Sequence, residues 1–177
     1  MQEVLIATVE GLEVLAHRVL EGVAQRPPEA GAAQTGAMVF ALHGELGAGK
    51  TTFTQTLAKV LGVAEHVTSP TFVVMRIYPT GVSAPFSKLV HIDAYRIESL
   101  DELRVIGFED LARDPENLIC IEWAGRVEDV LPPDALHITF MQSDTPETAG
   151  ARTATFGYKA GDSVTDEKQA DQRRGKI

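Results

Sequence analysis

The early part of the chain alternates between helical and strand-like spacing of its apolar residues. In 9–25 these residues recur every three or four positions, which predicts an amphipathic helix: Leu12, Leu15, Val19 and Val23. A loop rich in proline, glycine and alanine follows over 26–37, and the apolar run 38–42 (MVFAL) predicts a buried strand. A second helix is expected over 50–61, and Gly62 is suited to end it.

The later apolar runs predict further strands. Three of them are 71–79 (TFVVMRIYP), 88–96 (KLVHIDAYR) and 117–123 (NLICIEW). The runs 135–140 and 153–159 are candidates for two late strands, with a hairpin as one arrangement. Strands that alternate with helical segments are typical of an α/β fold, in which ligands lie at the carboxyl edge of the sheet.

Capping signals and breaks in the apolar pattern divide the rest of the chain. Ser99 is followed three residues later by Glu102, the spacing of a capping box, so a helix should begin there. A short helix over 127–133 (VEDVLPP) would be ended by its prolines. Residues 161–177 hold almost no apolar side chains and are expected to form a disordered tail, which leaves 1–160 as the folded domain.

Composition and charge limit the function classes. The chain has 177 residues and is 44% apolar, which is ordinary for one compact domain. No run is long and apolar enough to span a bilayer, and the acidic N-terminus lacks the pattern of a secretory signal. The single cysteine, Cys120, lies in an apolar run, so a buried thiol in the cytoplasm is expected. The net charge of −9 disfavours unaided binding to a nucleic-acid backbone.

The segment 44–51 (GELGAGKT) fits the phosphate-binding pattern G-x-x-x-x-G-K-[ST] at every fixed position. Its glycines let the backbone curl so that N–H groups point at phosphate oxygens, and the following helix adds its positive N-terminal end. Lys50 would reach the β and γ phosphates, and the Thr51 hydroxyl would ligate magnesium. Because no Asn-Lys-x-Asp motif for guanine is present, ATP is favoured over GTP.

These patterns together predict the fold class. We expect an α/β fold with a single P-loop NTPase-type domain, whose mostly parallel central sheet is flanked by helices and has a late antiparallel edge. Asp93 and Glu122 each follow an apolar run and should emerge at the sheet edge near the phosphates. They are candidates for binding magnesium or polarising water, although an acidic residue at a strand end can also be ordinary surface.

Four further residues have both a functional and an ordinary interpretation. Thr71, in TSPTF, is placed where a switch segment can sense a γ-phosphate, but Ser-Pro also makes polar turns. Arg96 is either an arginine finger or a surface ion-pair partner. His91 alternates with Asp93 on one strand and is more typical of a buried, hydrogen-bonded histidine than of a ligand. Trp123 is either a packing residue or a contact for nucleotide or a partner.

Five segments, in this order, resemble the TsaE family of small bacterial ATPases: GELGAGKTTF (44–53), TSPTF (68–72), HIDAYR (91–96), IGFEDL (106–111) and IEW (121–123). The P-loop alone is generic, but its combination with the other segments is specific. This family acts in the tRNA threonylcarbamoyladenosine system. The resemblance implies a cytoplasmic protein that binds ATP and magnesium and hydrolyses ATP slowly alone. It also implies association with TsaD and TsaB, so that tRNA is met only through the complex.

The resemblance also assigns roles to single residues. Thr51 and Glu122 would hold magnesium, Asp93 would act as a magnesium-water ligand or base, and Thr71 would be the switch threonine. Thr8 loosely matches an N-terminal position that approaches the adenine. The residues expected to contact the nucleotide are Thr8, Glu45, Leu46, Gly47, Ala48, Gly49, Lys50, Thr51, Thr52 and Trp123.

Two rival functions share the P-loop. A small-molecule kinase would also need an acceptor pocket and an arginine-rich lid, whereas Arg104, Arg113 and Arg126 are scattered. A nucleotide-dependent scaffold would bind ATP without turning it over. Phosphate release, phosphate transfer to a metabolite, and binding without turnover distinguish the three.

Overall fold

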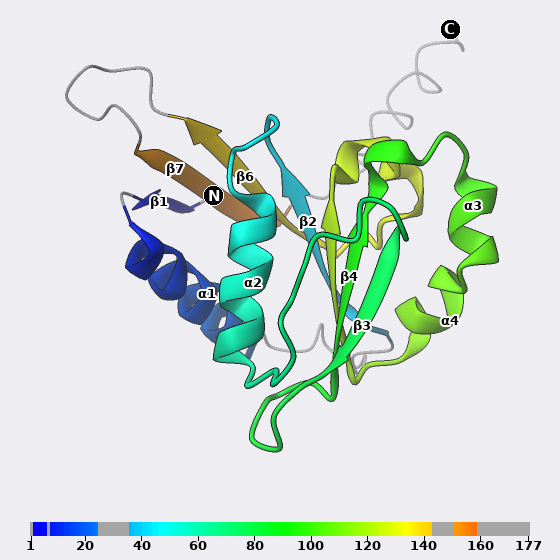
Figure 1. The fold of residues 1–177 in the computed structure, drawn as a ribbon, viewed down its shortest axis with the longest axis horizontal. Coiled ribbons are helices and arrows are strands. Elements are labelled where there is room, and N and C mark those ends of the chain that lie inside the picture. The colour runs from blue at the N-terminus through cyan, green and yellow to red at the C-terminus, as the bar shows by residue number, and fades with distance from the viewer. Residues whose placement is uncertain (1, 7, 25–35, 143–150, 159–177) are drawn as a thin grey trace, which may run out of the picture.

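One β-sheet runs through the protein and brings distant parts of the chain side by side (Figure 1). The computed structural model describes residues 2–6, 8–24, 36–142 and 151–158. The sheet has seven strands in the order β1-β7-β6-β2-β5-β4-β3. Their bounds are β1 Gln2–Ile6, β2 Met38–His43, β3 Met75–Pro79, β4 Lys88–Asp93, β5 Asn117–Glu122, β6 Leu136–Gln142 and β7 Arg152–Tyr158.

The four central strands are parallel, as predicted. β2 pairs in parallel with both β5 and β6, and β4 pairs in parallel with β5. β7 runs antiparallel to β6, which confirms the late antiparallel edge, and β1 extends this edge by pairing antiparallel with β7. At the opposite edge β3 is antiparallel to β4. Neither β1 nor the direction of β3 was predicted, because each is a short edge strand specified by its partner more than by its own pattern.

Alternating residues of the strands divide the core into two layers. On β2, Phe40 and Leu42 face one cluster and Val39 and Ala41 face the other. The first cluster is covered by α1 (Val9–Ala24) and α2 (Lys50–Val60), which confirms both predicted helices. The second is covered by α3 (Leu100–Val105) and α4 (Phe108–Arg113), on the other side of the sheet (Figure 1).

The predicted strand over 71–79 is too long, because β3 begins only at Met75. Before it, the backbone N–H groups of Val73 and Val74 both donate to the carbonyl of Pro70, which forms a turn. Val74 has a φ of 65°, a conformation that ends any extended segment. The apolar Phe-Val-Val run therefore belongs to a surface turn, where Phe72 and Val73 are exposed.

The predicted capping box is present. The carboxylate of Glu102 accepts a hydrogen bond from the N–H of Ser99 at 2.9 Å, and the N–H groups of Glu98 and Ser99 lower the pKa of Glu102. α4 was not predicted; it follows α3 directly after Gly107, whose φ is 77°. The predicted helix over 127–133 is a single 3₁₀ turn, Glu128–Val130 (η3), and two further turns are Ala94–Arg96 (η1) and Ala124–Arg126 (η2).

The topology brings the predicted phosphate loop and the predicted carboxylates to one edge of the sheet. The parallel strands β2, β4 and β5 all end there, and they lead into the loop 44–49, into η1 and into Trp123. The predicted tail 161–177 lies outside the described residues. Within the described ranges, the helices are all too short or too polar for a membrane span.

Candidate phosphate and metal site at the carboxyl edge of the sheet

The loop between β2 and α2 has a backbone that only glycine accommodates easily. Gly44 has a φ of 134°, and a Cβ atom there would lie 2.5 Å from the carbonyl oxygen of Phe140 on β6. Gly49, which caps α2, has a φ of 109°. These positions let the loop curl close to the sheet and present the unpaired N–H groups of the first turn of α2. The geometry is that of an anion-binding loop.

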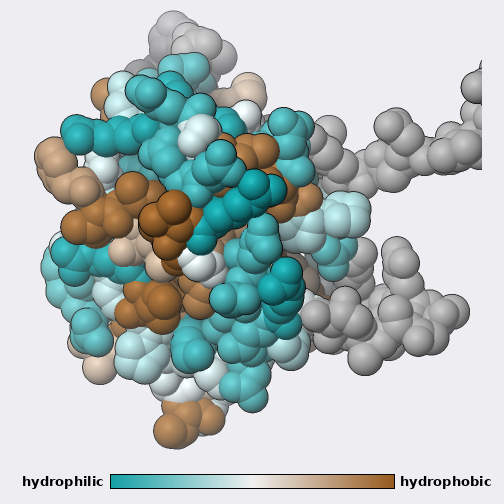
Figure 2. All heavy atoms as spheres, turned by 90° about the vertical axis from the view of Figure 1, so that its right-hand side faces the viewer, coloured by the Kyte–Doolittle hydropathy of each residue, from teal (hydrophilic) through white to brown (hydrophobic). Residues whose placement is uncertain are grey.

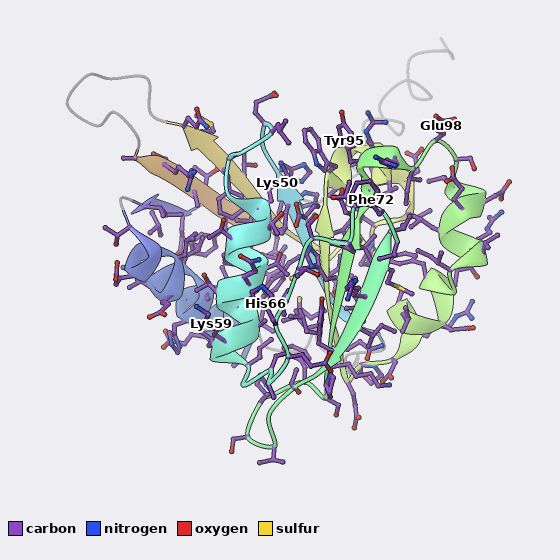
Figure 3. The ribbon with its side chains drawn as sticks, in the orientation of Figure 1. Lys50, Lys59, His66, Phe72, Tyr95 and Glu98 are labelled. Carbon is purple, nitrogen blue, oxygen red and sulfur yellow. The ribbon has the colours of Figure 1, made fainter. Side chains whose placement is uncertain are left out.

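Lys50 is the first residue of α2 and lies at its N-terminal end (Figure 3). Its ammonium donates hydrogen bonds to the carbonyls of Gly44 at 2.7 Å and Glu45 at 2.9 Å. The side chain is buried, and this burial lowers the pKa of Lys50, while the carboxylates of Glu122, Asp93 and Glu45 act to raise it. The loop thus holds a desolvated cation where a phosphate would lie.

Thr51 joins the loop to the last residue of β5. Its hydroxyl donates to Oε2 of Glu122 at 2.9 Å. Glu122 is only 3% exposed, and its other oxygen, Oε1, lies 2.8 Å from Nε2 of His91. A hydroxyl and a carboxylate oxygen in contact, beside an anion-binding loop, are the hard oxygen ligands that magnesium prefers.

Asp93 ends β4 and has its own partners. The Thr71 hydroxyl donates to Asp93 Oδ2 at 2.5 Å, and the N–H of Tyr95 donates to Oδ1 at 3.0 Å. Ser69 Oγ lies 2.7 Å from the Thr71 hydroxyl oxygen and supplies its hydrogen, because the hydrogen of Thr71 is used by Asp93. The turn that carries Ser69 and Thr71 is therefore tied to the carboxylate.

Aromatic side chains border the site. The ring of Trp123 lies with its centroid 4.0 Å from the ammonium of Lys50, and Tyr95 packs against it with ring centroids 5.1 Å apart. Trp123 has a φ of 58°, a strained conformation for a residue with a side chain. Among the described non-glycine residues only Trp123 and Val74 have positive φ, and both flank the site. Such strain is concentrated at functional positions.

These elements enclose a cavity of about 300 Å³. It is lined by Leu46, Gly47, Gly49, Lys50, Thr51, Thr52, Ser69, Thr71, Asp93, Tyr95, Glu122 and Trp123. Most of the predicted site residues are thus brought together. Of the remaining three, Glu45 and Ala48 belong to the loop, where the N–H of Ala48 donates to the carbonyl of Glu45 at 3.1 Å. Thr8 lies apart from the lining, between β1 and α1, where it hydrogen-bonds Glu10 and lowers the pKa of that carboxyl.

Arg152 is a candidate that the sequence did not reveal. It begins β7, opposite Gln142 at the carboxyl end of β6, so the antiparallel pairing returns it to the edge that carries the loop. A Cβ atom built on Gly49 would lie 3.5 Å from Cδ of Arg152, so this side chain lies directly against the loop. Only the strand pairing brings it there, because Arg152 lies far along the chain from the P-loop motif.

Arg96, by contrast, is not among the residues that line the cavity. Its guanidinium lies 4.8 Å from the ring centroid of Phe72, and its side chain is exposed. The structure therefore places it on the surface of the Thr71 turn. His91 is buried behind Glu122, which is the hydrogen-bonded position expected of it.

The site has three chemical capabilities. The loop amides and Lys50 can bind a chain of phosphates, the pair Thr51–Glu122 can bind a hard cation, and Asp93 can orient or deprotonate water. No group of three or more histidine, cysteine or acidic residues suited to holding a metal alone occurs among the described residues.

Several known proteins are similar to this chain in sequence. Residues 17–152 match the family of the threonylcarbamoyl adenosine biosynthesis protein TsaE. The chain is 38% identical over 109 residues to the tRNA threonylcarbamoyladenosine biosynthesis protein TsaE of Bacillus subtilis, covering 62% of this chain and 65% of that one. The protein of that name from Streptomyces coelicolor is 48% identical over 94 residues, which cover 50% of this chain and 59% of the relative. The matches thus span somewhat under two thirds of these two relatives.

A solved structure agrees with the fold. The crystal structure of YdiB from Bacillus subtilis superposes with a TM-score of 0.62 and 26% sequence identity, covering 90% of this chain and 86% of the other. The central sheet and flanking helices are therefore those of a P-loop NTPase-type fold. With the family match over most of its length, the chain belongs to the TsaE family of threonylcarbamoyl adenosine biosynthesis proteins.

Proposed function

We propose that this chain binds and hydrolyses ATP with the help of magnesium, as the ATPase component of the cytoplasmic machinery that makes N6-threonylcarbamoyladenosine in tRNA. The observation that carries the proposal is the convergence of the loop 44–51 with the ends of β4 and β5 in one cavity. The relatives named as tRNA threonylcarbamoyladenosine biosynthesis proteins support the pathway.

In this proposal the triphosphate lies over the N-terminal end of α2. The backbone N–H groups of the loop bind its oxygens, and Lys50 exchanges its contacts with the Gly44 and Glu45 carbonyls for the β and γ phosphates. Arg152, beside Gly49, adds a second positive charge. In the sheet order, β7 with Arg152 lies on one side of β2, and β5, which Trp123 follows, lies on the other. Burial removes water from the ammonium, so a phosphate oxygen in contact with it compensates for the lost solvation.

Thr51 and Glu122 would hold the magnesium ion. When bound, the ion would neutralise charge on the phosphates and fix their position. The fit rests on the two oxygen donors that already lie 2.9 Å apart at the end of the loop. Lys50, 4.0 Å from the ring of Trp123, would keep the aromatic side chain over the phosphate end of the pocket.

Asp93 would act on the attacking water. Both of its oxygens already accept one hydrogen bond, but a carboxylate oxygen can accept a second, so Oδ2 can take the proton of a water molecule. Thr71 links this carboxylate to an exposed turn. A γ-phosphate that draws on the Thr71 hydroxyl would therefore move the turn, and hydrolysis would release it.

The partners in the proposal are TsaD and TsaB, with tRNA bound only through the complex. Figure 2 shows apolar surface on the side of the molecule that carries β3, α3 and α4. Exposed apolar side chains include Phe72 and Val73 in the turn next to Thr71, and Ile77 on β3. An apolar surface joined to the proposed switch supports contact with a protein that responds to the nucleotide state. The net charge of −9 disfavours direct binding of tRNA.

The proposal is tested by incubating the purified chain with ATP labelled at the γ-phosphate, with and without TsaB and TsaD. Release of labelled phosphate that rises when the partners are added supports it. Transfer of label to a metabolite would instead support a small-molecule kinase. Binding without turnover, even with the partners, would support a nucleotide-dependent scaffold.

A further inference from the structure

A buried histidine lies behind the proposed magnesium ligand. His91 is fully buried on β4, and its Nε2 atom is 2.8 Å from Oε1 of Glu122 on β5. Its other ring nitrogen, Nδ1, has no hydrogen-bond partner among the described residues. Among the described residues, the side chain of His91 therefore makes its hydrogen bond to Glu122.

The chemistry of the contact assigns its donor. An ionised carboxylate only accepts hydrogen bonds, so Nε2 of His91 must carry the hydrogen. The arrangement is thus an imidazole whose Nε2–H donates to Oε1 of Glu122.

The two oxygens of Glu122 have different partners. Oε1 accepts from His91 behind the site, and Oε2 accepts from the Thr51 hydroxyl at 2.9 Å at the front. Two donors on opposite sides fix the rotation of the carboxylate, so that Oε2 stays beside the hydroxyl oxygen. The ammonium of Lys50 is also within electrostatic reach of Glu122, and a carboxylate without the His91 bond would be free to turn toward it.

The surroundings of His91 hold the ring in place. In the sheet His91 is in register with Cys120, which is itself buried and hydrogen-bonded to Thr54 on α2. His91 and Asp93 lie two residues apart on the same face of β4. The strand that carries Asp93 therefore also carries the group that orients Glu122, so the two carboxylates are positioned by one element.

We infer that His91 is a positioning residue that orients Glu122 for magnesium. It does not touch the metal or the nucleotide, and it acts through the carboxylate. The inference rests on the proposed magnesium–nucleotide site. Histidine and carboxylate partners behind a metal ligand commonly change metal affinity by about 10- to 100-fold when they are removed.

The test compares ADP binding with and without magnesium by isothermal titration calorimetry. The quantity of interest is the ratio of ADP affinity in magnesium to ADP affinity in EDTA. The variants are His91→Leu, which removes the donor, and His91→Gln, whose amide N–H can occupy the place of Nε2. The control is Leu89→Ala, which removes a buried side chain on the same face of β4 that belongs to the core.

We expect His91→Leu to lower the ratio about tenfold, at the lower end of the range for such partners, while leaving ADP affinity in EDTA unchanged. His91→Gln should keep most of the wild-type ratio, and Leu89→Ala should keep all of it even where its melting temperature falls. An unchanged ratio in His91→Leu would overturn the inference, and so would an equal loss in His91→Gln and Leu89→Ala.

Failure of the underlying site has a different signature. If the wild-type chain binds ADP equally well in magnesium and in EDTA, the proposed metal site is wrong, and so is the role inferred for His91. If the wild type shows a magnesium effect that His91→Leu retains, only the role of His91 is wrong.

Discussion

Asp93 and Glu122 are partners in register at the carboxyl ends of the parallel strands β4 and β5. Each has a separate donor: the Thr71 hydroxyl contacts Asp93 at 2.5 Å, and the Thr51 hydroxyl contacts Glu122 at 2.9 Å. Two adjacent carboxylates are thus tied to different parts of the chain, one to an exposed turn and the other to the phosphate loop. This separation predicts separate functions for the two residues.

Replacing Asp93 should impair hydrolysis more than binding. We expect Asp93→Asn to leave the affinity for ADP in magnesium within about threefold of wild type, while phosphate release falls at least about 100-fold, as loss of a general base does. Glu122→Gln should also cut phosphate release, but it should additionally remove most of the gain in ADP affinity that magnesium provides, while binding stays measurable.

Asp101→Asn is the matched control, because Asp101 lies on the surface of α3 and pairs with Arg104. Calorimetry and a phosphate-release assay give the two readouts. Wild-type turnover in Asp93→Asn would remove this residue from the reaction.

The two lysines of α2 provide a matched pair for the phosphate contact. Lys50 begins the helix beside the loop, and Lys59 lies near its other end (Figure 3). Lys50→Ala should weaken ATP binding at least about tenfold, because a charge-assisted hydrogen bond is worth about 1.5–3 kcal/mol. Lys59→Ala should bind like the wild type. Equal affinities in both variants would show that the ammonium of Lys50 does not reach the phosphates.

Trp123 should report nucleotide binding through its fluorescence. It is the single tryptophan of the chain, and its ring lies 4.0 Å from the ammonium that the phosphates would attract. Adding ADP or ATP should therefore change its emission with the same affinity that calorimetry gives, and Lys50→Ala should lose the change at the same nucleotide concentration. An emission spectrum that stays constant while calorimetry detects binding would place the ring outside the nucleotide pocket.

The lowered pKa of Lys50 predicts how nucleotide binding depends on pH. Phosphate favours the charged lysine, so binding raises the pKa of Lys50 and takes up a proton wherever the free protein has lost it. Affinity for ADP must then fall as pH rises through the pKa of Lys50 in the free protein, which lies below its ordinary value of 10.5. Titrations of the wild type in EDTA at constant ionic strength should show this decline beginning below that pH, and an affinity that stays level throughout would contradict it.

Much of the site was predictable because its residues are marked locally. The phosphate loop is a contiguous motif, and Asp93 and Glu122 are marked by the apolar strands that they end. Arg152 and the contact of His91 with Glu122 could not be predicted in this way, because each depends on a strand pairing between distant segments. The same reason explains the missed edge strand β1, which pairs with the last described strand, β7.

The predicted strand over 71–79 failed for a different reason. Its apolar residues Phe72, Val73 and Val74 have the composition of a strand, but Pro70 accepts two backbone hydrogen bonds and the chain turns. Phe72 and Val73 are therefore exposed beside the site, while Val74 is partly buried against the core layer that α3 and α4 cover.

A second and larger cavity, of about 360 Å³, lies between α3, α4 and η3 and is lined in part by Leu103 and Phe108. It has no glycine loop or paired carboxylates, so its chemistry does not favour a nucleotide. This cavity lies on the other face of the sheet from α2. A ligand bound in it can therefore be distinguished from a ligand bound at the loop 44–51.

The most direct test of the account is the amide spectrum of the ¹⁵N-labelled chain titrated with ADP and magnesium. If main-chain N–H groups bind the phosphates, the largest shifts should belong to residues 47–51, with smaller ones at Glu122 and Trp123. The signals from the amides of α3 and α4 should not shift. Unshifted signals from 47–51, together with shifts at Leu103 and Phe108, would contradict the account.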